Sequence, residues 1–301
     1  MGRATASLVS NERPAWTAYL ELLKPITWFP PMWAFGCGVV SSGQALAERW
    51  PFALLGVLLA GPLVCGASQI VNDWFDRDVD AINEPDRPVP SGRVPGRNAL
   101  YFAIAWSALS LGVGAVLGPV VFAATVVGVV LAWAYSAPPA RLKRNGWWGN
   151  AAVGICYEGL PWFTAAAALI GGMPPVEIIL LAAAYSLGAH GIMTLNDYKA
   201  IAGDRRLGIR SLPVQLGPDG AARVACIVML VPQVAVVGLL ATWQLPVAAS
   251  VVAALIVIQA MMMLRFLRQP VAQAAWYSAL GVPVYVLGML ASAVGVRALP
   301  L

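Results

Sequence analysis

The stretch NALYFAIAWSALSLGVGAVLGPVVFAATVVGVVLAWAYSAPPA, residues 98–140, contains no Asp, Glu, Lys or Arg. A membrane-spanning helix needs about 20 predominantly apolar residues, so this run is long enough for two spans, with a turn at Gly118-Pro119 between them. Further charge-free runs cover residues 25–47, 50–72, 159–176, 224–264 and 269–296. The sequence therefore predicts an all-α polytopic membrane protein.

The overall composition agrees with this prediction. Of the 301 residues, 59% are hydrophobic and 11% are charged, against roughly 45–50% and 25% in soluble domains. So few charges could not cover a soluble surface, which argues against a nucleic-acid-binding protein, a disordered chain or a secreted disulfide scaffold. The four cysteines show no metal-site spacing, and we interpret them as small buried hydrophobic residues. We expect no cleavable signal peptide.

Charges and turn signals divide the chain into about nine expected spans: 22–42, 52–76, 98–118, 120–137, 150–170, 175–195, 220–241, 246–266 and 274–296. We expect them to form one domain over residues 22–297, after a cytoplasmic N-terminal segment, residues 1–21. With the N-terminus in the cytoplasm, every Lys and Arg except Arg49 and Arg297 falls on that side. The positive-inside rule then places the C-terminus on the opposite side and the long polar loops in the cytoplasm.

Two similar polar stretches point to an internal repeat. Asn72-Asp73 ends the second expected span and Asn196-Asp197 ends the sixth, and each opens an aspartate-containing loop, residues 72–97 and 196–218. A duplicated four-helix unit, related by an axis along the membrane normal, would bring the two loops together. Chance similarity of two short polar segments is the alternative.

The acidic residues of the first loop have helical spacing. Asp73, Asp76 and Asp80 share one helix face at i, i+3 and i+7, where like charges repel unless a cation lies among them. Carboxylates are hard ligands, and Mg²⁺ is typically held by one or two of them together with waters and substrate phosphates. We therefore predict a Mg²⁺ site; the alternative is a solvated acidic loop that balances nearby arginines.

Basic residues accompany both acidic stretches. One group follows the fourth expected span, and the other surrounds Asp197 and Asp204: Arg141, Lys143 and Arg144, then Lys199, Arg205, Arg206 and Arg210. Acidic clusters with interleaved Arg and Lys suit a diphosphate bridged by a divalent metal. Contact with lipid headgroups, or control of topology, would explain the bases but not the acids.

At this point the motifs resemble those of the UbiA-type intramembrane prenyltransferases. The matching residues are Asn72-Asp73-x-x-Asp76-x-x-x-Asp80 and Asp197 to Asp204-x-x-x-Gly208-x-x-Ser211-x-Pro213. The resemblance implies nine transmembrane helices and two aspartate-rich motifs that bind Mg²⁺ and an isoprenoid diphosphate. It departs from many members at Ala200 and Ala202, where an acid is common, so the second metal shell would depend on Asp197 and Asp204.

Longer stretches, among them NDWFDRDVDAINEPDRPVPSGRVPGR (72–97), YEGLPWF (157–163) and NDYKAIAGDRRLGIRSLPVQLG (196–217), resemble the chlorophyll and bacteriochlorophyll synthase branch of that family, and the last favours the bacteriochlorophyll side. This resemblance implies esterification of a bacteriochlorophyllide or chlorophyllide propionate with a geranylgeranyl or phytyl group from its diphosphate. It also implies a bacterial inner (intracytoplasmic photosynthetic) membrane, a cytoplasmic active site, and partners in pigment synthesis or photosystem assembly.

The resemblance implies roles for named residues. Asp76, Asp80 and Lys143 would be catalytic. The metal ligands would be Asp73, Asp76, Asp80, Asp197 and Asp204, and the diphosphate-binding residues Asn72, Arg87, Arg141, Lys143, Arg144, Lys199 and Arg205. A propionate is already ionised at pH 7, so the reaction needs no strong protein base.

Two polar residues inside expected spans are candidate pigment contacts. Glu158 could orient the chlorin or could simply pair with a base, because intramembrane acids are costly. His190 could ligate the chlorin magnesium or could be a packing histidine.

Two other functions compete with this interpretation. A family member that prenylates an aromatic quinone precursor would share both motifs. A transporter would place charges at the middle of the bilayer, whereas here they gather at one face. The choice between the phytyl and geranylgeranyl donors, the preferred pigment and the oligomeric state stay open.

Overall fold

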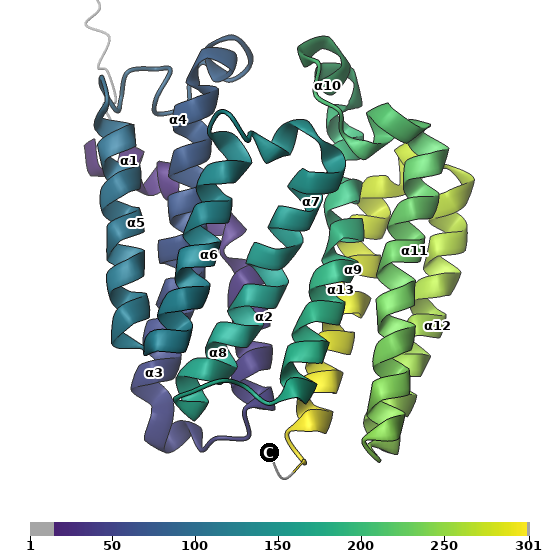
Figure 1. Cartoon of the computed structure of the whole chain (residues 1–301). Helices are drawn as coiled ribbons and strands as arrows, with labels where there is room; N and C mark the ends of the chain where they lie inside the picture. The colour runs from purple at the N-terminus through teal and green to yellow at the C-terminus, as the bar shows by residue number, and fades with distance from the viewer. Residues whose placement is uncertain (1–14, 300–301) are drawn as a thin grey trace, which may run out of the picture.

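The computed structural model describes residues 15–299, which form a bundle of α-helices without a β-strand in that range (Figure 1). The helices are α1 (Ala15–Leu23), α2 (Phe29–Ser41), α3 (Leu46–Leu58), α4 (Gly66–Asn83), α5 (Asn98–Val116), α6 (Pro119–Ser136), α7 (Gly146–Gly154), α8 (Leu160–Ile170), α9 (Val176–Asp197), α10 (Ile201–Leu207), α11 (Leu212–Thr242), α12 (Pro246–Arg268) and α13 (Pro270–Val296). Most of the expected N-terminal segment, residues 1–14, lies outside the described residues.

Eight continuous helical stretches within residues 15–299 are long and apolar enough to cross a membrane. They correspond to the second to ninth expected spans, and three of them are composite: α3 continues into α4, α7 into α8, and α9 into α10. The prediction of an all-α polytopic membrane protein is confirmed.

The first expected span, residues 22–42, is a broken helix rather than one continuous span. Lys24 adopts a left-handed conformation with φ of 44°, a 3₁₀ turn follows at Pro25–Thr27, and α2 restarts at Phe29 before two further prolines. Proline supplies no backbone N–H, so it is tolerated in the first turn of a helix and interrupts one elsewhere. Helix α2 therefore has only 13 residues, about 20 Å of helix.

The α3–α4 and α7–α8 spans each contain a π-helical turn at the junction of their two helices. The first covers Leu59–Cys65 and includes Pro62, and the second covers Ile155–Gly159. A π-turn rotates the side chains that follow it relative to a regular α-helix, and such turns are frequent at functional sites.

Small residues bring the helices of the second aspartate motif close together. A Cβ added at Gly191 of α9 would lie 2.5 Å from the Ala225 carbonyl oxygen of α11, and one at Gly154 of α7 would lie 2.6 Å from the Ser186 oxygen of α9. In membranes, helices associate through such close packing of small residues. These contacts hold α7 beside α9, which places Asn150 next to the end of α9.

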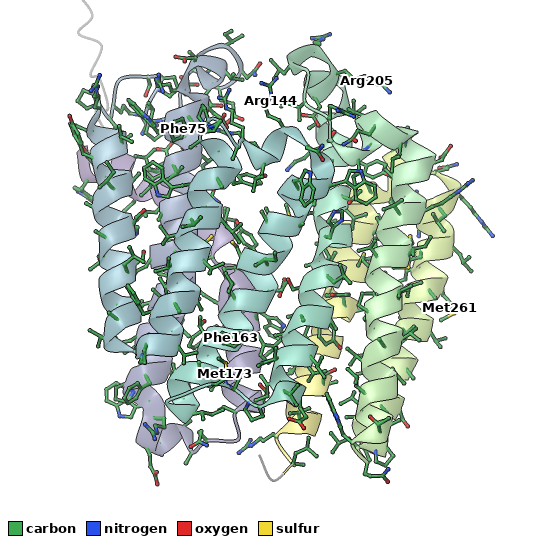
Figure 2. The ribbon with its side chains drawn as sticks, in the orientation of Figure 1. Phe75, Arg144, Phe163, Met173, Arg205 and Met261 are labelled. Carbon is green, nitrogen blue, oxygen red and sulfur yellow. The ribbon has the colours of Figure 1, made fainter. Side chains whose placement is uncertain are left out.

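The two predicted polar loops lie at the same end of the bundle. Figure 1 shows the end of α4 and the short helix α10 projecting at that end, above α6 and α7. Figure 2 shows Arg144 and Arg205 there as well, whereas Met173 lies toward the opposite end. The fold therefore gathers both aspartate motifs at one face.

Candidate active site

The first acidic motif lies on the last turns of α4, which extends to Asn83. Asp73, Asp76 and Asp80 are therefore on one helix face, as their spacing predicted. Asp73 and Asp80 are 1% and 7% exposed, respectively, whereas the Asp76 side chain is 23% exposed. Asp76 is thus the most accessible carboxylate of the three.

Each of these carboxylates has a basic partner. Lys24 Nζ lies 2.6 Å from Asp73 Oδ1, Arg87 Nη1 lies 2.9 Å from Asp80 Oδ2, and Lys143 Nζ lies 2.5 Å from Asp76 Oδ2. Arg87 also binds Glu84 through two hydrogen bonds of 2.6 and 2.8 Å. The ion pairs relieve the repulsion that three acids on one face would otherwise cause.

The surroundings of Arg87 and Lys143 shift the pKa values of these two residues in opposite directions. Burial opposes the charge of Arg87, but hydrogen bonds to Glu84 and the charges of Asp80 and Asp73 outweigh that cost and raise its pKa. Burial lowers the pKa of Lys143 from its ordinary value, although the charge of Asp76 opposes the shift. Lys143 is therefore a desolvated ammonium group, which would interact strongly with an anion.

The second acidic motif begins at the end of α9. Asn150 Nδ2 donates to Thr194 Oγ1 at 3.3 Å and to Asp197 Oδ2 at 3.4 Å. Asp204 lies on α10. This helix ends at Leu207, and the next residue, Gly208, adopts a left-handed backbone conformation with φ of 65°. The Asp204 carbonyl accepts the Ile209 N–H at 2.9 Å, which closes this short helix.

Backbone hydrogen bonds join the basic segment after α6 to the second motif. The Gly146 N–H donates to the Arg210 carbonyl at 2.8 Å, and the Arg210 N–H donates to the Arg144 carbonyl at 2.9 Å. Lys143 is thus held between the two motifs: its side chain contacts Asp76 and its backbone segment is bound to the second loop.

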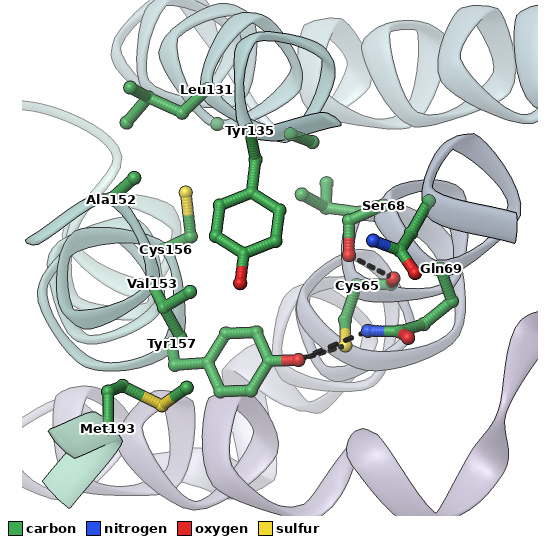
Figure 3. A pocket seen from close by; sticks show the side chains of 14 residues that line it. Cys65, Ser68, Gln69, Leu131, Tyr135, Ala152, Val153, Cys156, Tyr157 and Met193 are labelled. Carbon is green, nitrogen blue, oxygen red and sulfur yellow. Dashed lines mark hydrogen bonds between the residues drawn. The ribbon is translucent and has the colours of Figure 1, made fainter. Parts of the chain in front are cut away.

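Tyr135, at the end of α6, marks the space that the two motifs share. It lies within electrostatic range of Asp76, Asp197 and Asp204. Below it is a cavity of about 210 Å³, lined by residues of the α3–α4 and α7–α8 spans, α6 and α9: Val64, Cys65, Ser68, Gln69, Asn72, Gly128, Leu131, Ala132, Tyr135, Ala152, Val153, Cys156, Tyr157 and Met193 (Figure 3). The cavity carries mostly apolar groups, and its lining includes Asn72, the residue next to Asp73.

The other predicted diphosphate-binding residues occupy the rim of the site. Asn72 Nδ2 donates to Ser136 Oγ at 3.1 Å, and Arg141 Nη2 donates to the Phe75 carbonyl at 3.3 Å. Arg144, Lys199 and Arg205 are exposed at the same end, and no ion pair is found for them within residues 15–299. Their cationic groups are available to an incoming anion.

The two candidate pigment contacts do not line this cavity. Glu158 is 5% exposed on the π-turn Ile155–Gly159, within electrostatic range of Cys37 and Tyr285, and its Oε2 has no partner among the described residues. His190 Nε2 lies 3.2 Å from the Trp147 carbonyl oxygen, so Nε2 carries the proton. His190 lines a separate groove of about 400 Å³ between the α7–α8 span and α9.

Sequence reasoning missed four polar residues at or beside the site: Lys24, Gln69, Asn150 and Tyr157. Gln69 precedes Asn72 and Asp73 by one helical turn, so the polar stripe of α4 could have been extended to it. Lys24 is a lone lysine at the start of an apolar run. Nothing in the local sequence marks Asn150, whose role depends on the contact with α9.

A Mg²⁺ ion fits these residues only in cooperation with substrate. Within residues 15–299, no three His, Cys, Asp or Glu side chains are close enough to form a protein-only metal cage. Mg²⁺ commonly takes one or two carboxylates and completes its shell with waters and phosphates. Asp76 on one side, and Asp197 and Asp204 on the other, provide that kind of incomplete shell. Asp73 Oδ2, which is buried without a hydrogen-bond partner among residues 15–299, is the Asp73 oxygen that would take part.

Comparisons with known proteins identify relatives of this chain. The model of the UbiA prenyltransferase family matches residues 23–292. The chain is 56% identical over 293 residues to the bacteriochlorophyll synthase 33 kDa chain of Cereibacter sphaeroides, with 97% of each chain covered. It is 53% identical over 283 residues to the protein of that name from Rhodobacter capsulatus, with 93% of each covered.

A solved structure shares the fold. The UbiA homolog from Archaeoglobus fulgidus bound to GPP and Mg²⁺ has a TM-score of 0.71 and 20% identity, covering 91% of this chain and 99% of that one. The resemblance noted in the two aspartate motifs is confirmed by the family match over most of the chain. The protein therefore belongs to the UbiA prenyltransferase family.

Proposed function

We propose that the protein esterifies the propionate of bacteriochlorophyllide or chlorophyllide with a geranylgeranyl or phytyl group from its diphosphate, releasing diphosphate. The observation that carries this proposal is that Lys143 pairs with Asp76 while its backbone segment is hydrogen-bonded to the second aspartate motif, at one end of a membrane bundle that contains a mostly apolar cavity. The bacteriochlorophyll synthases that are 56% and 53% identical support the choice of acceptor.

The charged rim would bind the diphosphate. Lys143, Arg141 and Arg144 lie on or beside one loop that faces Asp76, and Lys199 and Arg205 approach from the second motif. Arg87 would order the loop after α4 through Glu84 and Asp80, and the N–H groups that these two acids do not use would face the phosphates. Binding at this rim would leave the allylic carbon at the mouth of the cavity.

The acidic residues would complete the leaving-group site. Asp76 and Asp80 on one side, and Asp197 and Asp204 on the other, would hold Mg²⁺ with Asp73 behind them. When bound, Mg²⁺ neutralises the charge that builds on the departing diphosphate. Asn72, fixed by Ser136, would orient a phosphate oxygen or a ligand water.

The acceptor requires no proton abstraction. A propionate of ordinary pKa is ionised at pH 7, so its oxygen can attack the allylic carbon directly. The apolar lining of the cavity would keep water away from the electron-deficient carbon, which water would otherwise capture.

The proposal includes the topology in the membrane. Counting the broken α1–α2 region as the first of nine spans, the N-terminus lies in the cytoplasm and the C-terminus on the other side, with residues 22–297 as one domain. The distribution of Lys and Arg supports this orientation. The active site would then face the cytoplasm from the bacterial inner (intracytoplasmic photosynthetic) membrane, near partners in pigment synthesis or photosystem assembly.

Glu158 and His190 are proposed to influence the pigment from beside the cavity. His190 borders the groove between the α7–α8 span and α9, where an apolar macrocycle could lie against the bundle. Glu158 shares its π-turn with Tyr157, so a change in Glu158 would reach the cavity through that turn.

The deciding experiment supplies membranes containing the protein with each pigment acid and each isoprenoid diphosphate, and separates the products by chromatography. We expect an esterified pigment to form with at least one pair. Prenylation of an aromatic quinone precursor, with no pigment ester formed, would refute the proposal in favour of another reaction of the family.

A further inference from the structure

The polar stripe of α4 continues below the aspartates into the cavity. Gln69 lies one turn before Asn72 and Asp73, and its side chain lines the cavity wall. Opposite it, Tyr157 projects from the π-turn Ile155–Gly159 (Figure 3). Polar side chains inside a membrane-spanning bundle are costly and usually serve a function.

The hydrogen bonds of this pair leave donors available. Gln69 Nε2 donates to Tyr157 Oη at 3.3 Å, and Cys65 Sγ lies 3.6 Å from the same oxygen. Because the single Cys65 thiol proton also reaches the Thr27 carbonyl oxygen at 3.5 Å, and that oxygen can only accept, the Tyr157 O–H donates to Cys65 Sγ in a long, weak contact. The Gln69 amide also has a second N–H. That N–H is unused in these contacts, and the Tyr157 O–H loses only a weak contact with sulfur when it turns to one additional acceptor in the cavity.

The rest of the cavity lining offers few other partners for an anion. It contains no Lys, Arg or His, and the one other hydroxyl without a hydrogen bond among the described residues is that of Tyr135. Ser68 Oγ donates to the Cys65 carbonyl of its own helical stretch at 2.7 Å, and Asn72 donates to Ser136 at 3.1 Å. The nearby ammonium groups of Lys24 and Lys143 are bound to Asp73 and Asp76.

The backbone departs from the α-helix at Tyr157 and one turn before Gln69. Cys65 ends the π-turn Leu59–Cys65, and Tyr157 is in the middle of the π-turn Ile155–Gly159. Two π-turns on different spans therefore direct side chains to the same point. Because π-turns are rare and gather at functional sites, this is a second, independent sign that the point binds a ligand.

We propose that Gln69 and Tyr157 bind the carboxylate of the acceptor and hold one of its oxygens toward the allylic carbon at the cavity mouth. This inference rests on the proposed function. A bond forms between the carboxylate oxygen and the allylic carbon while the bond from that carbon to the diphosphate oxygen breaks, and its electron pair leaves with the diphosphate. No proton is transferred.

Neutral donors suit this task better than a cation would. A lysine or arginine in the cavity would form an ion pair with the carboxylate and reduce its nucleophilicity. An amide and a phenol orient the carboxylate while leaving its negative charge available to the electron-deficient carbon. The pair would also discriminate in favour of acids, because an ester has no charged oxygen to place between the two donors.

The test compares the pigment acid with its methyl ester, which has the same macrocycle without the carboxylate. Pigment binding is measured by the change in absorbance when full-length protein in detergent is titrated with each compound. We expect the wild type to bind the acid more tightly, and Tyr157→Phe and Gln69→Met each to weaken acid binding by roughly tenfold or more. Affinity for the ester, and the KM for the isoprenoid diphosphate, should stay within about twofold of wild type.

Tyr101→Phe is the matched control, because Tyr101 is an exposed residue of α5 that loses the same hydroxyl. Equal weakening of acid and ester binding would show that the pair only packs the cavity, and unchanged acid binding would show that the carboxylate lies elsewhere. Either result overturns this inference while leaving pigment esterification by the wild type intact. Failure of the wild type to esterify any pigment refutes the proposed function instead.

Discussion

Replacing Lys143 with alanine should lower kcat/KM for the isoprenoid diphosphate by roughly 10- to 150-fold. The Lys143 Nζ and Asp76 Oδ2 atoms are 2.5 Å apart, with side chains only 15% and 23% exposed, so the ammonium group is in a poorly solvated position. A hydrogen bond to a charged group contributes about 1.5–3 kcal/mol. At about 1.4 kcal/mol per factor of ten, loss of one such contact to the diphosphate gives the stated range.

Initial rates of ester formation, measured against the isoprenoid diphosphate at saturating pigment, give kcat and KM separately. Lys143→Arg keeps the charge and should recover most of the lost activity. Arg268→Ala removes an exposed positive charge at the end of α12 and should leave the rates unchanged. Equal amounts of folded protein are verified by size-exclusion chromatography in detergent.

Pigment affinity provides the decisive comparison for Lys143. Because the residue is bound to Asp76 at the rim and does not line the cavity, pigment binding should be nearly unchanged in Lys143→Ala. Loss of pigment affinity together with normal diphosphate kinetics would refute the reasoning, since the basic segment would then serve the other substrate.

Three further outcomes are expected. Asp76→Ala or Asp80→Ala should abolish turnover while the protein still inserts in membranes. An excess of chelator should stop the wild-type reaction until Mg²⁺ is added, and full activity in chelator would exclude a role for the metal. The dependence of the reaction rate on pH should show no essential base titrating between about pH 6 and 8. A pigment methyl ester should not be prenylated, and prenylation of the ester at the rate of the acid would rule out a propionate nucleophile. Glu158→Gln and His190→Ala should reduce activity only moderately, because neither side chain lines the cavity. The reduction should come from weaker pigment binding, measured by absorbance. Complete loss of the chemical step in a folded variant would show that the replaced residue is catalytic.

Hydropathy alone determined the class of the protein. Charge-free runs such as residues 98–140 can only be buried or face lipid, so they predict spans whatever their neighbours are. The spacing of Asp73, Asp76 and Asp80 predicted a shared helix face because helical periodicity is a local property. The two aspartate motifs also identified the family, which the comparisons confirm.

The first span shows where the local pattern is insufficient. Residues 25–47 are charge-free, and apolarity alone predicts one helix there. The left-handed Lys24 and the prolines that follow it divide the region. Lys24 adopts this conformation in a structure in which its side chain also binds Asp73, a partner far along the chain.

Only the tertiary structure decided how the polar side chains are combined. The sequence placed Lys143 near a diphosphate and Asp76 near a metal, but not within hydrogen-bonding distance of each other. It gave no reason to connect Gln69 of α4 with Tyr157 of a distant π-turn. Helical spacing relates residues within one helix, whereas these pairs depend on how the small residues of different helices pack. Sequence therefore determined the membrane helices and the chemistry of the motifs, and packing between helices determined which donor faces which acceptor.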